Sequence, residues 1–346
     1  MELTYSNAGV DISQTDAIKS EISGFIDTGN PRVLNGLGPF ASLYDIKFDD
    51  IKNPVLVLKA EEPGSKQKLA VEYGYVESIC HDMINHLVND IIVMGAKPLA
   101  VLDTIVCGEA DKDIIKSLIK GMSEACAAND CALVGGETSV QPSVVDKGTY
   151  VLTSSVAGIV DRQDIIDGSK ISEGDIVLAV ASNGLHTNGY SLVRMLMDKM
   201  PEVINDKIED TGETFIQAIM KPHTAYYKSV RDLFAEKKIK GMAHITGGGI
   251  EGNLNRIMPD GLCAEIDLAK IEVPAVFKYI KNKGGVSDEE MLRTFNCGAG
   301  VMIVVDKNAA ESAAAHVSQY YKCYEAGVIC AGSEKIKFVN RLSFNK

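Results

Sequence analysis

The feature that most constrains the fold is the run Thr246-Gly247-Gly248-Gly249, in which three successive glycines carry no Cβ. The run follows a short apolar stretch, 239–245, that is typical of the end of a strand, and apolar residues at helical spacing come after it. A glycine loop that opens a helix directs backbone N–H groups outward at the positive end of the helix dipole. The loop therefore predicts either a phosphate or carboxylate site or a tight turn that needs positive φ.

The composition is that of an α/β protein. The chain has 346 residues, enough for two domains, with 46% hydrophobic residues, 24% charged residues and 31 glycines. Its formal net charge is −12, and no cluster of lysines is interleaved with aromatic residues, so we expect no nucleic-acid partner.

The chain shows no leader-like start, and no apolar run approaches the ~18 residues that a membrane span needs. We therefore expect a cytoplasmic protein with no membrane partner. The 8 cysteines lack a CxxC pair and lack Cys/His spacing typical of zinc sites, which predicts buried thiols.

Strand-like and helix-like segments alternate along the chain, as in α/β folds. Strands are expected at 54–58, 99–106, 131–134, 150–160, 175–181, 239–245, 261–267 and 301–305, and helices at 78–94, 113–128, from about 191, within 213–236, at 274–283 and at 309–320. A turn-rich connector at 164–174 separates the two halves. The pattern predicts two α/β domains, 1–168 and 169–346.

Two polar segments are expected at strand ends in the first half. In Glu61-Glu62-Pro63-Gly64-Ser65-Lys66, acids beside a glycine and a lysine suit Mg²⁺ and a phosphate, although a solvated charged turn fits the same residues. Gly135-Gly136-Glu137-Thr138 follows the next strand but one. Both segments place polar groups at the end of an expected strand.

The helix at 78–94 carries polar residues outside its apolar series. Asp82 and Asn89 lie two turns apart, and Asp90 falls close to the same side. Such acids are either metal ligands or solvated surface groups. Asp103, within an apolar strand, must be paired, protonated or metal-bound if it is buried.

His186 stands in the second-half loop Ser182-Asn183-Gly184-Leu185-His186-Thr187-Asn188-Gly189. An imidazole in a polar glycine loop titrates near neutral pH and can reach a ligand. A structural histidine is the alternative.

Several motifs together resemble the phosphoribosylformylglycinamidine cyclo-ligase family, also called aminoimidazole ribonucleotide synthetases. They are Ala8-Gly9-Val10-Asp11-Ile12, Gly36-Leu37-Gly38 with Phe40, Val88-Asn89-Asp90, 95–99, 133–138, 166–170, 186–194, 244–249 and 293–298. These motifs span nearly the whole chain in the order that the family shows.

The resemblance implies an N-terminal α/β domain whose strands join those of a partner in a dimeric barrel, and a C-terminal mixed sheet with packed helices. It implies that ATP, with Mg²⁺, activates the formamide oxygen of formylglycinamidine ribonucleotide for ring closure. The catalytic residues it implies are His186, Lys66 and Asp90. Nucleotide- and phosphate-binding residues would be Gly64, Ser65, Lys66, Asn89, Gly136, Thr138, Asn188, Thr246, Gly247, Gly248 and Gly249, and metal ligands would be Glu61, Asp82, Asp90 and Glu137.

The chain departs from the family pattern in the first half only. Segments 61–66, 137–143 and 150–154 differ from the usual family sequence. Two acidic residues of the family are replaced, by Val140 and Val151. The rival hypothesis is a catalytically impaired paralogue that binds a phosphorylated ligand in a regulatory or partner-binding role. A third is another enzyme of the same superfamily, such as a thiamine-monophosphate kinase, but the second-half motifs disfavour it. We also expect a homodimer, because an antiparallel first-half sheet would expose an apolar edge at 54–58 or 150–160.

Overall fold

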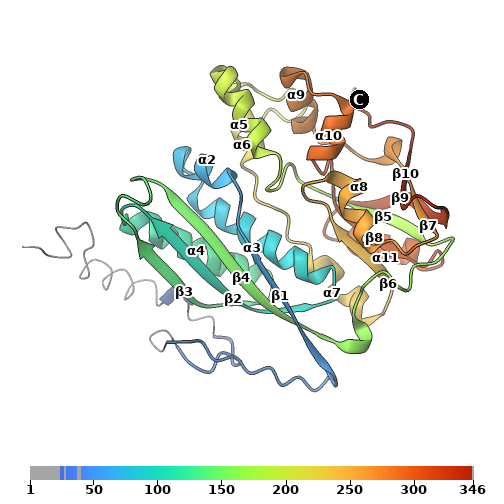
Figure 1. Ribbon diagram of the computed structural model, residues 1–346, viewed down its shortest axis with the longest axis horizontal. Helices are drawn as coiled ribbons and strands as arrows, with labels where there is room; N and C mark the ends of the chain where they lie inside the picture. The colour runs from blue at the N-terminus through green and yellow to red at the C-terminus, as the bar shows by residue number, and fades with distance from the viewer. Residues whose placement is uncertain (1–23, 27–28, 37–39, 345–346) are drawn as a thin grey trace, which may run out of the picture. The chain divides into compact units, whose positions relative to one another are not determined.

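The computed structural model describes residues 24–26, 29–36 and 40–344, which divide into two compact units (Figure 1). Unit 1 comprises Met1–Ile91 and Lys97–Arg162, and unit 2 comprises Ile92–Ala96 and Gln163–Lys346. The motif at 8–12 lies outside the described residues. Within the described ranges, no helix combines the length and the apolar character that crossing a bilayer requires.

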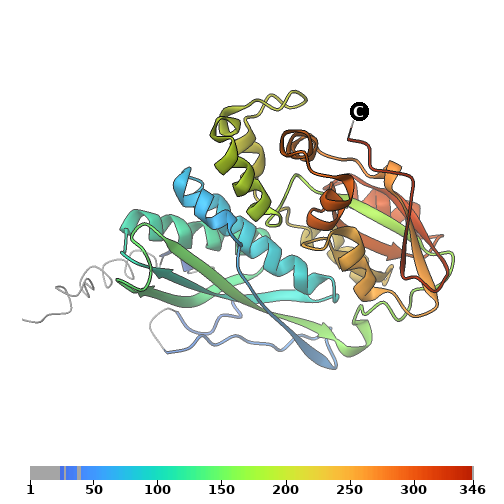
Figure 2. The same cartoon turned by 45° about the horizontal axis from the view of Figure 1, so that its top comes forward.

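Unit 1 is built on a four-stranded sheet in the order β1-β4-β2-β3. Its strands are β1 (Pro54–Glu61), β2 (Lys97–Cys107), β3 (Ala132–Val140) and β4 (Tyr150–Asp161), and its helices are α2 (Lys66–Glu72), α3 (Val76–Ile92) and α4 (Lys112–Ala128). Both α3 and α4 run across the same face of this sheet (Figure 1 and Figure 2).

The apolar pattern of unit 1 explains this packing. Ile79, Met83 and Leu87 recur at helical spacing along α3, and all three are fully buried. In β2, Val101 is buried, whereas its neighbour Leu102 is 47% exposed, because successive side chains point to opposite faces. The helices therefore cover one face of the sheet, and the other face keeps exposed apolar side chains.

Three expectations for unit 1 require correction. The strand expected at 131–134 extends to Val140, so Gly135 to Thr138 lie within β3 and not beyond its end. A register shift at Val101/Leu102 lets β2 continue to pair with this stretch. β4 is an inner strand between β1 and β2, so 150–160 is not an edge, whereas β1 is one. The sheet is also not wholly antiparallel, because β3 pairs parallel to β2.

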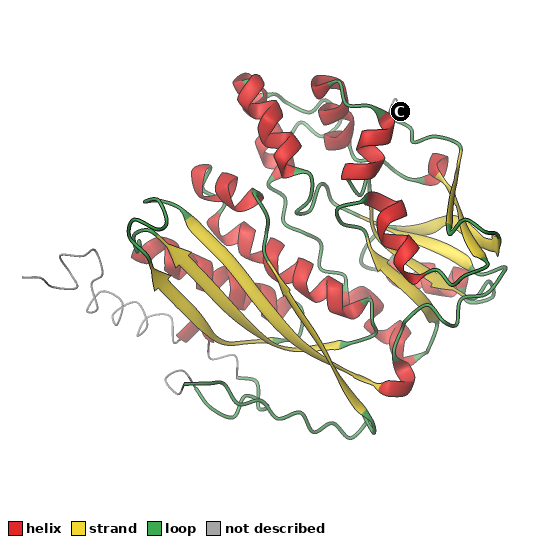
Figure 3. Cartoon of the chain, in the orientation of Figure 1, coloured by secondary structure: helices red, strands yellow, loops and turns green. Residues whose placement is uncertain are grey.

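Unit 2 is built on a six-stranded mixed sheet in the order β10-β7-β9-β5-β8-β6, seen as yellow arrows in Figure 3. The strands are β5 (Ile176–Ala181), β6 (Ile239–His244), β7 (Leu262–Asp267), β8 (Ala299–Val305), β9 (Cys323–Ala331) and β10 (Ile336–Val339). The helices are α5 (Tyr190–Lys199), α6 (Phe215–Ile219), α7 (Tyr227–Ala235), α8 (Gly249–Leu254), α9 (Ala275–Gly284), α10 (Asp288–Thr294) and α11 (Ala310–Val317).

The core of unit 2 runs along β8, where all 7 residues are buried. A strand buried on both faces carries a continuous apolar run, as Val301 to Val305 does here. One helix, α10, was not expected from the sequence, because its exposed acidic first turn, Asp288 to Glu290, carries little apolar periodicity. The glycine run itself opens α8, which begins at Gly249.

The cysteine expectation is confirmed for the described residues. All 8 cysteines are free thiols, and 7 of them are buried.

Candidate active site

In unit 1, two of the expected metal ligands converge on one lysine. Lys59 Nζ lies 3.0 Å from Glu61 Oε2 and 3.0 Å from Asp90 Oδ2. His86 Nε2 lies 3.9 Å and 3.7 Å from the same two carboxylate oxygens. Burial opposes the charge on Lys59, but the hydrogen bonds and charges of both acids outweigh burial and raise the pKa of this lysine. The end of β1 and the second half of α3 thus form a cation-binding carboxylate pair.

Lys66 and Asp82 form a separate ion pair. Both side chains are fully buried, and Lys66 Nζ lies 2.7 Å from Asp82 Oδ2. Burial lowers the pKa of Lys66, and the charge of Asp82 opposes that effect. Lys66 is the first residue of α2, and Ser65 is the N-cap of this helix. Gly64, the residue before the N-cap, has φ 65°. A buried pair of this kind depends on both partners, since removing one leaves an unpaired charge.

The acids of β2 and β3, Asp103 and Glu137, have different surroundings. Asp103 is buried beside Gly136, where a Cβ would overlap the Asp103 carboxylate. Burial, opposed by a backbone hydrogen bond and reinforced by the charge of Glu137, raises the pKa of Asp103 to about 7. Glu137 itself is exposed and lines a groove of about 950 Å³ on unit 1. Thr138, next to it, pairs with Ile105 of β2.

Asn89 is the remaining first-half candidate, and it is fully buried in α3. The structure therefore joins Glu61 with Asp90, pairs Lys66 with Asp82, and puts Glu137 in a groove.

In unit 2, the loop between β5 and α5 is held by Asn296. The Asn296 amide donates to the Gly184 carbonyl at 3.0 Å, and its Oδ1 accepts from Ser182 Oγ at 2.9 Å and from the Gly298 N–H at 2.8 Å. His186, within this loop, has φ 60°, a left-handed conformation that is uncommon for a residue with a Cβ. Such strain persists only where surrounding contacts fix it.

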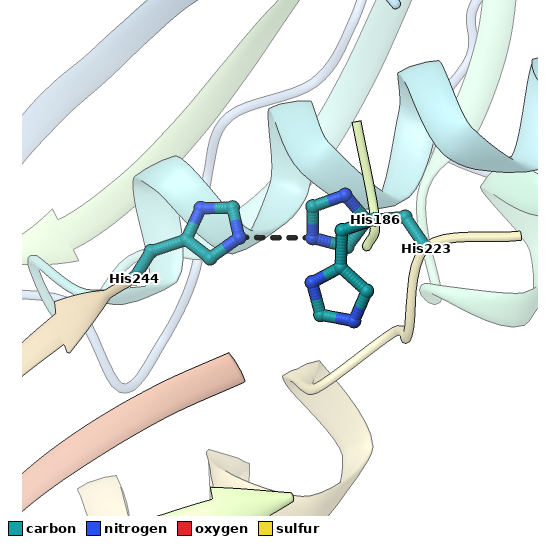
Figure 4. Close-up of side chains that lie close together, drawn as sticks. All are labelled: His186, His223 and His244. Carbon is teal, nitrogen blue, oxygen red and sulfur yellow. Dashed lines mark hydrogen bonds between the residues drawn. The ribbon is translucent and has the colours of Figure 1, made fainter. Parts of the chain in front are cut away.

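His186 lies beside two other histidines that sequence reasoning missed as functional candidates (Figure 4). His223 Nε2 lies 2.9 Å from His244 Nε2, and the rings of His186 and His223 stack with centroids 3.9 Å apart. Their exposed fractions are 1% for His186, 1% for His223 and 5% for His244. His186 Nε2 also lies 3.3 Å from Thr224 Oγ1. Three imidazoles thus share one buried position.

The glycine loop lies next to the histidine loop. Gly248 and Gly249 have φ values of 94° and 63°, so the turn does need positive φ. The Asn253 amide donates to the carbonyl oxygens of Thr246, Gly247 and Gly249 at 3.3, 3.2 and 2.8 Å. A Cβ on Gly247 would stand 3.3 Å from Asn188 Oδ1. The structure therefore brings together Asn188 and the loop residues expected to bind phosphate.

The two units match the domain models of one protein class, the AIR synthase related proteins. The N-terminal domain model matches residues 52–160, and the C-terminal domain model matches residues 172–339.

Named relatives identify the family within this class. The chain is 42% identical over 319 residues to a phosphoribosylformylglycinamidine cyclo-ligase of Methylobacillus flagellatus, with 91% of each chain covered. It is 39% identical over 341 residues to one of Carboxydothermus hydrogenoformans, covering 97% of this chain and 98% of that protein. The chain belongs to the phosphoribosylformylglycinamidine cyclo-ligase family.

Solved structures share the fold at low identity. Escherichia coli HypE aligns with a TM-score of 0.67 at 17% identity, with 94% of each chain covered. A thiamine-monophosphate kinase from Stenotrophomonas maltophilia aligns with a TM-score of 0.66 at 15% identity, covering 96% of this chain and 98% of that one.

Proposed function

We propose that the protein closes the imidazole ring of aminoimidazole ribonucleotide from formylglycinamidine ribonucleotide and ATP, as a cytoplasmic enzyme of purine biosynthesis. The observation that carries the proposal is the identity of about 40% to named cyclo-ligases, which extends over both domains. In the reaction, phosphorylation of the formamide oxygen creates a good leaving group. An internal nitrogen then attacks the same carbon, and phosphate leaves.

The first domain, 1–168, is proposed to bind the nucleotide. The carboxylates of Glu61 and Asp90 already surround the ammonium of Lys59, and an oxygen pair that holds one cation suits Mg²⁺. Asp82, which pairs with Lys66, and Glu137, which lines the groove, are the other two ligands proposed from the sequence. Bound Mg²⁺ would neutralise charge that develops on the ATP phosphates. Gly64, Ser65, Asn89, Gly136 and Thr138 are the proposed nucleotide contacts.

Lys66, at the start of α2, is proposed as a catalytic residue of phosphoryl transfer. Its ammonium is held by Asp82 at 2.7 Å, so Asp82 keeps this buried cation charged and oriented. Loss of Asp82 would leave the ammonium buried without its carboxylate, where the neutral amine is favoured.

The second domain, 169–346, is proposed to hold the phosphorylated substrate. The loop Thr246 to Gly249, with Asn188, would receive its phosphate. His186 would move the proton that ring closure releases, because an imidazole can both accept and donate a proton.

A homodimer is also proposed. Leu56 is 52% exposed, Leu58 71% and Leu102 47%, all on the sheet face that the helices of unit 1 leave open. An apolar face of this kind suits a second copy of the same sheet.

The decisive experiment combines purified protein with formylglycinamidine ribonucleotide and Mg–ATP and measures ADP and the aminoimidazole product. We expect equal amounts of the two products. A folded protein that releases neither would overturn the proposal.

A further inference from the structure

Three of the 6 histidines of the chain gather in unit 2 from separate segments. His186 comes from the loop after β5, His223 from the segment before α7, and His244 is the last residue of β6. One ring nitrogen of each lies within 4.8 Å of one ring nitrogen of the others. We propose that these three imidazoles bind a divalent transition-metal ion of the zinc class.

The nitrogen spacing favours this class of ion. A tetrahedral zinc centre with Zn–N bonds of ~2.0–2.1 Å separates its nitrogen ligands by roughly 3.3 Å. The 2.9 Å between His223 Nε2 and His244 Nε2 is close to that separation. The His186 ring stacks on His223 at an interplanar angle of 20°, and one ligand nitrogen of each of the three rings lies within 4.8 Å of those of the other two (Figure 4).

The ligand chemistry of the three imidazoles differs from that of the Mg²⁺ site proposed in unit 1. Neutral imidazole nitrogens suit Zn²⁺, Ni²⁺ and Cu²⁺, whereas Mg²⁺ takes oxygen ligands. The proposed Mg²⁺ ligands are carboxylates, and the cluster consists of buried imidazoles.

Neighbouring groups orient the rings as they do in metal sites. Thr187 Oγ1 lies 3.5 Å from His223 Nδ1, on the side of the ring away from the nitrogen that faces His244. A polar group at the second ring nitrogen fixes the tautomer of a ligating histidine. Gly300 leaves room for the Tyr226 hydroxyl, which a Cβ would overlap, and for His186, whose Cε1 would lie 2.9 Å from that Cβ.

Occupancy has a consequence for catalysis that rests on the proposed function. A metal ion that holds the His186 lone pair removes this imidazole from proton transfer, so the loaded protein would be inhibited in ring closure. Metal binding itself does not depend on that role and is measured without substrate.

The test uses full-length protein without an affinity tag, freed of metal by a chelator and titrated with Co²⁺ as a spectroscopic probe. We expect 1:1 binding with the strong visible bands of four-coordinate Co²⁺, which Zn²⁺ abolishes and excess Mg²⁺ leaves unchanged. His223→Gln should weaken binding by at least about 100-fold. His316→Gln, in α11 of the same unit and outside the cluster, is the matched control and should bind as the wild type does.

Wild-type protein that binds no more tightly than His223→Gln, or whose Co²⁺ spectrum is that of an octahedral oxygen site, would overturn the proposal. The X-ray absorption spectrum of Zn²⁺-loaded wild type provides a test that needs no variant. Three imidazole ligands are expected, and a spectrum with fewer than three would count against the site. A protein that binds Co²⁺ as expected but makes no aminoimidazole product would refute the proposed function and leave the metal site supported.

Discussion

At the scale of single residues, Asp90 is the acid on which the proposed metal site most depends. Its Oδ2 lies 3.0 Å from the Lys59 ammonium, at the point where Glu61 also converges. Asp90→Asn removes a charged oxygen ligand while preserving the shape of the side chain, so we expect ADP release to fall by at least about 100-fold. Steady-state turnover with Mg–ATP measures this effect, with the exposed Asp50→Asn as the control. Undiminished turnover in Asp90→Asn would refute the assignment.

Asp103 gives a pH-dependent prediction. Its pKa is about 7 in the folded protein and 3.8 for the unperturbed group, chiefly because of burial. The folded state therefore holds a proton that the unfolded state has released between these two values. Stability from this group is complete below pH ~4 and is lost as pH rises toward ~7.

Asp103→Asn removes this titration while leaving a neutral side chain of the same shape. Between pH 5 and 8 the free energy of unfolding should therefore fall less for the variant than for the wild type, both without metal. The difference should be on the order of a few kcal/mol. Urea unfolding at several pH values measures the difference, and the exposed Asp146→Asn serves as the control. Parallel pH profiles for Asp103→Asn and wild type would contradict the raised pKa.

At the scale of elements, the glycines of α8 differ sharply although they lie in one short helix. Gly249 has φ 63°, and a Cβ there would overlap the Leu292 carbonyl oxygen. Gly252 has open space around it, with no heavy atom within 4 Å of an added Cβ. In the sequence the two glycines look alike. Only the tertiary structure shows that Gly249 is tightly packed and that Gly252 is not.

We expect Gly249→Ala to destabilise the protein by roughly 2–4 kcal/mol, from overpacking together with left-handed strain. Gly252→Ala is the matched control, and it should be neutral or stabilise by up to about 1 kcal/mol, because alanine favours a helix. Thermal midpoints of the two variants provide the comparison. Equal midpoints would show that the packing at Gly249 does not constrain the loop.

Local sequence patterns predicted whether a segment is a helix or a strand better than they predicted which strands pair. Apolar residues at helical spacing predicted α3 and α4, and β-branched runs predicted β4 and β8, because these patterns act within one segment. The apolar run at 99–106 could not show that β3 would extend past Gly135, since that extension depends on pairing with β2 through a register shift. The inner position of β4 likewise depends on which strands β1 and β2 pair with.

At the scale of the whole molecule, the open face of the unit 1 sheet predicts association. Leu58, 71% exposed, lies on that face, whereas Met195, 51% exposed, lies in α5 of unit 2. The wild type should sediment at twice the chain mass of 37.2 kDa. Leu58→Lys should shift the population toward monomer, because a charge in an apolar interface is desolvated without a partner, and Met195→Lys should not.

Sedimentation velocity at micromolar concentration measures this shift. A wild type that stays monomeric there would rule out the proposed homodimer. Dissociation by both lysine variants would instead show that the open sheet face is not the specific interface.

The sequence by itself determined the α/β class, the buried cysteines and, through motifs along its length, the family. These properties are written in local patterns and in short runs of consecutive residues. The tertiary structure alone decided that Lys66 pairs with Asp82 and that Lys59 joins Glu61 to Asp90. It alone brought His223 to His186 and His244, residues for which no Cys/His spacing gave a signal. Their proximity depends on which strands pair and on how the loops between them turn. Local sequence patterns do not specify such contacts between distant parts of the chain.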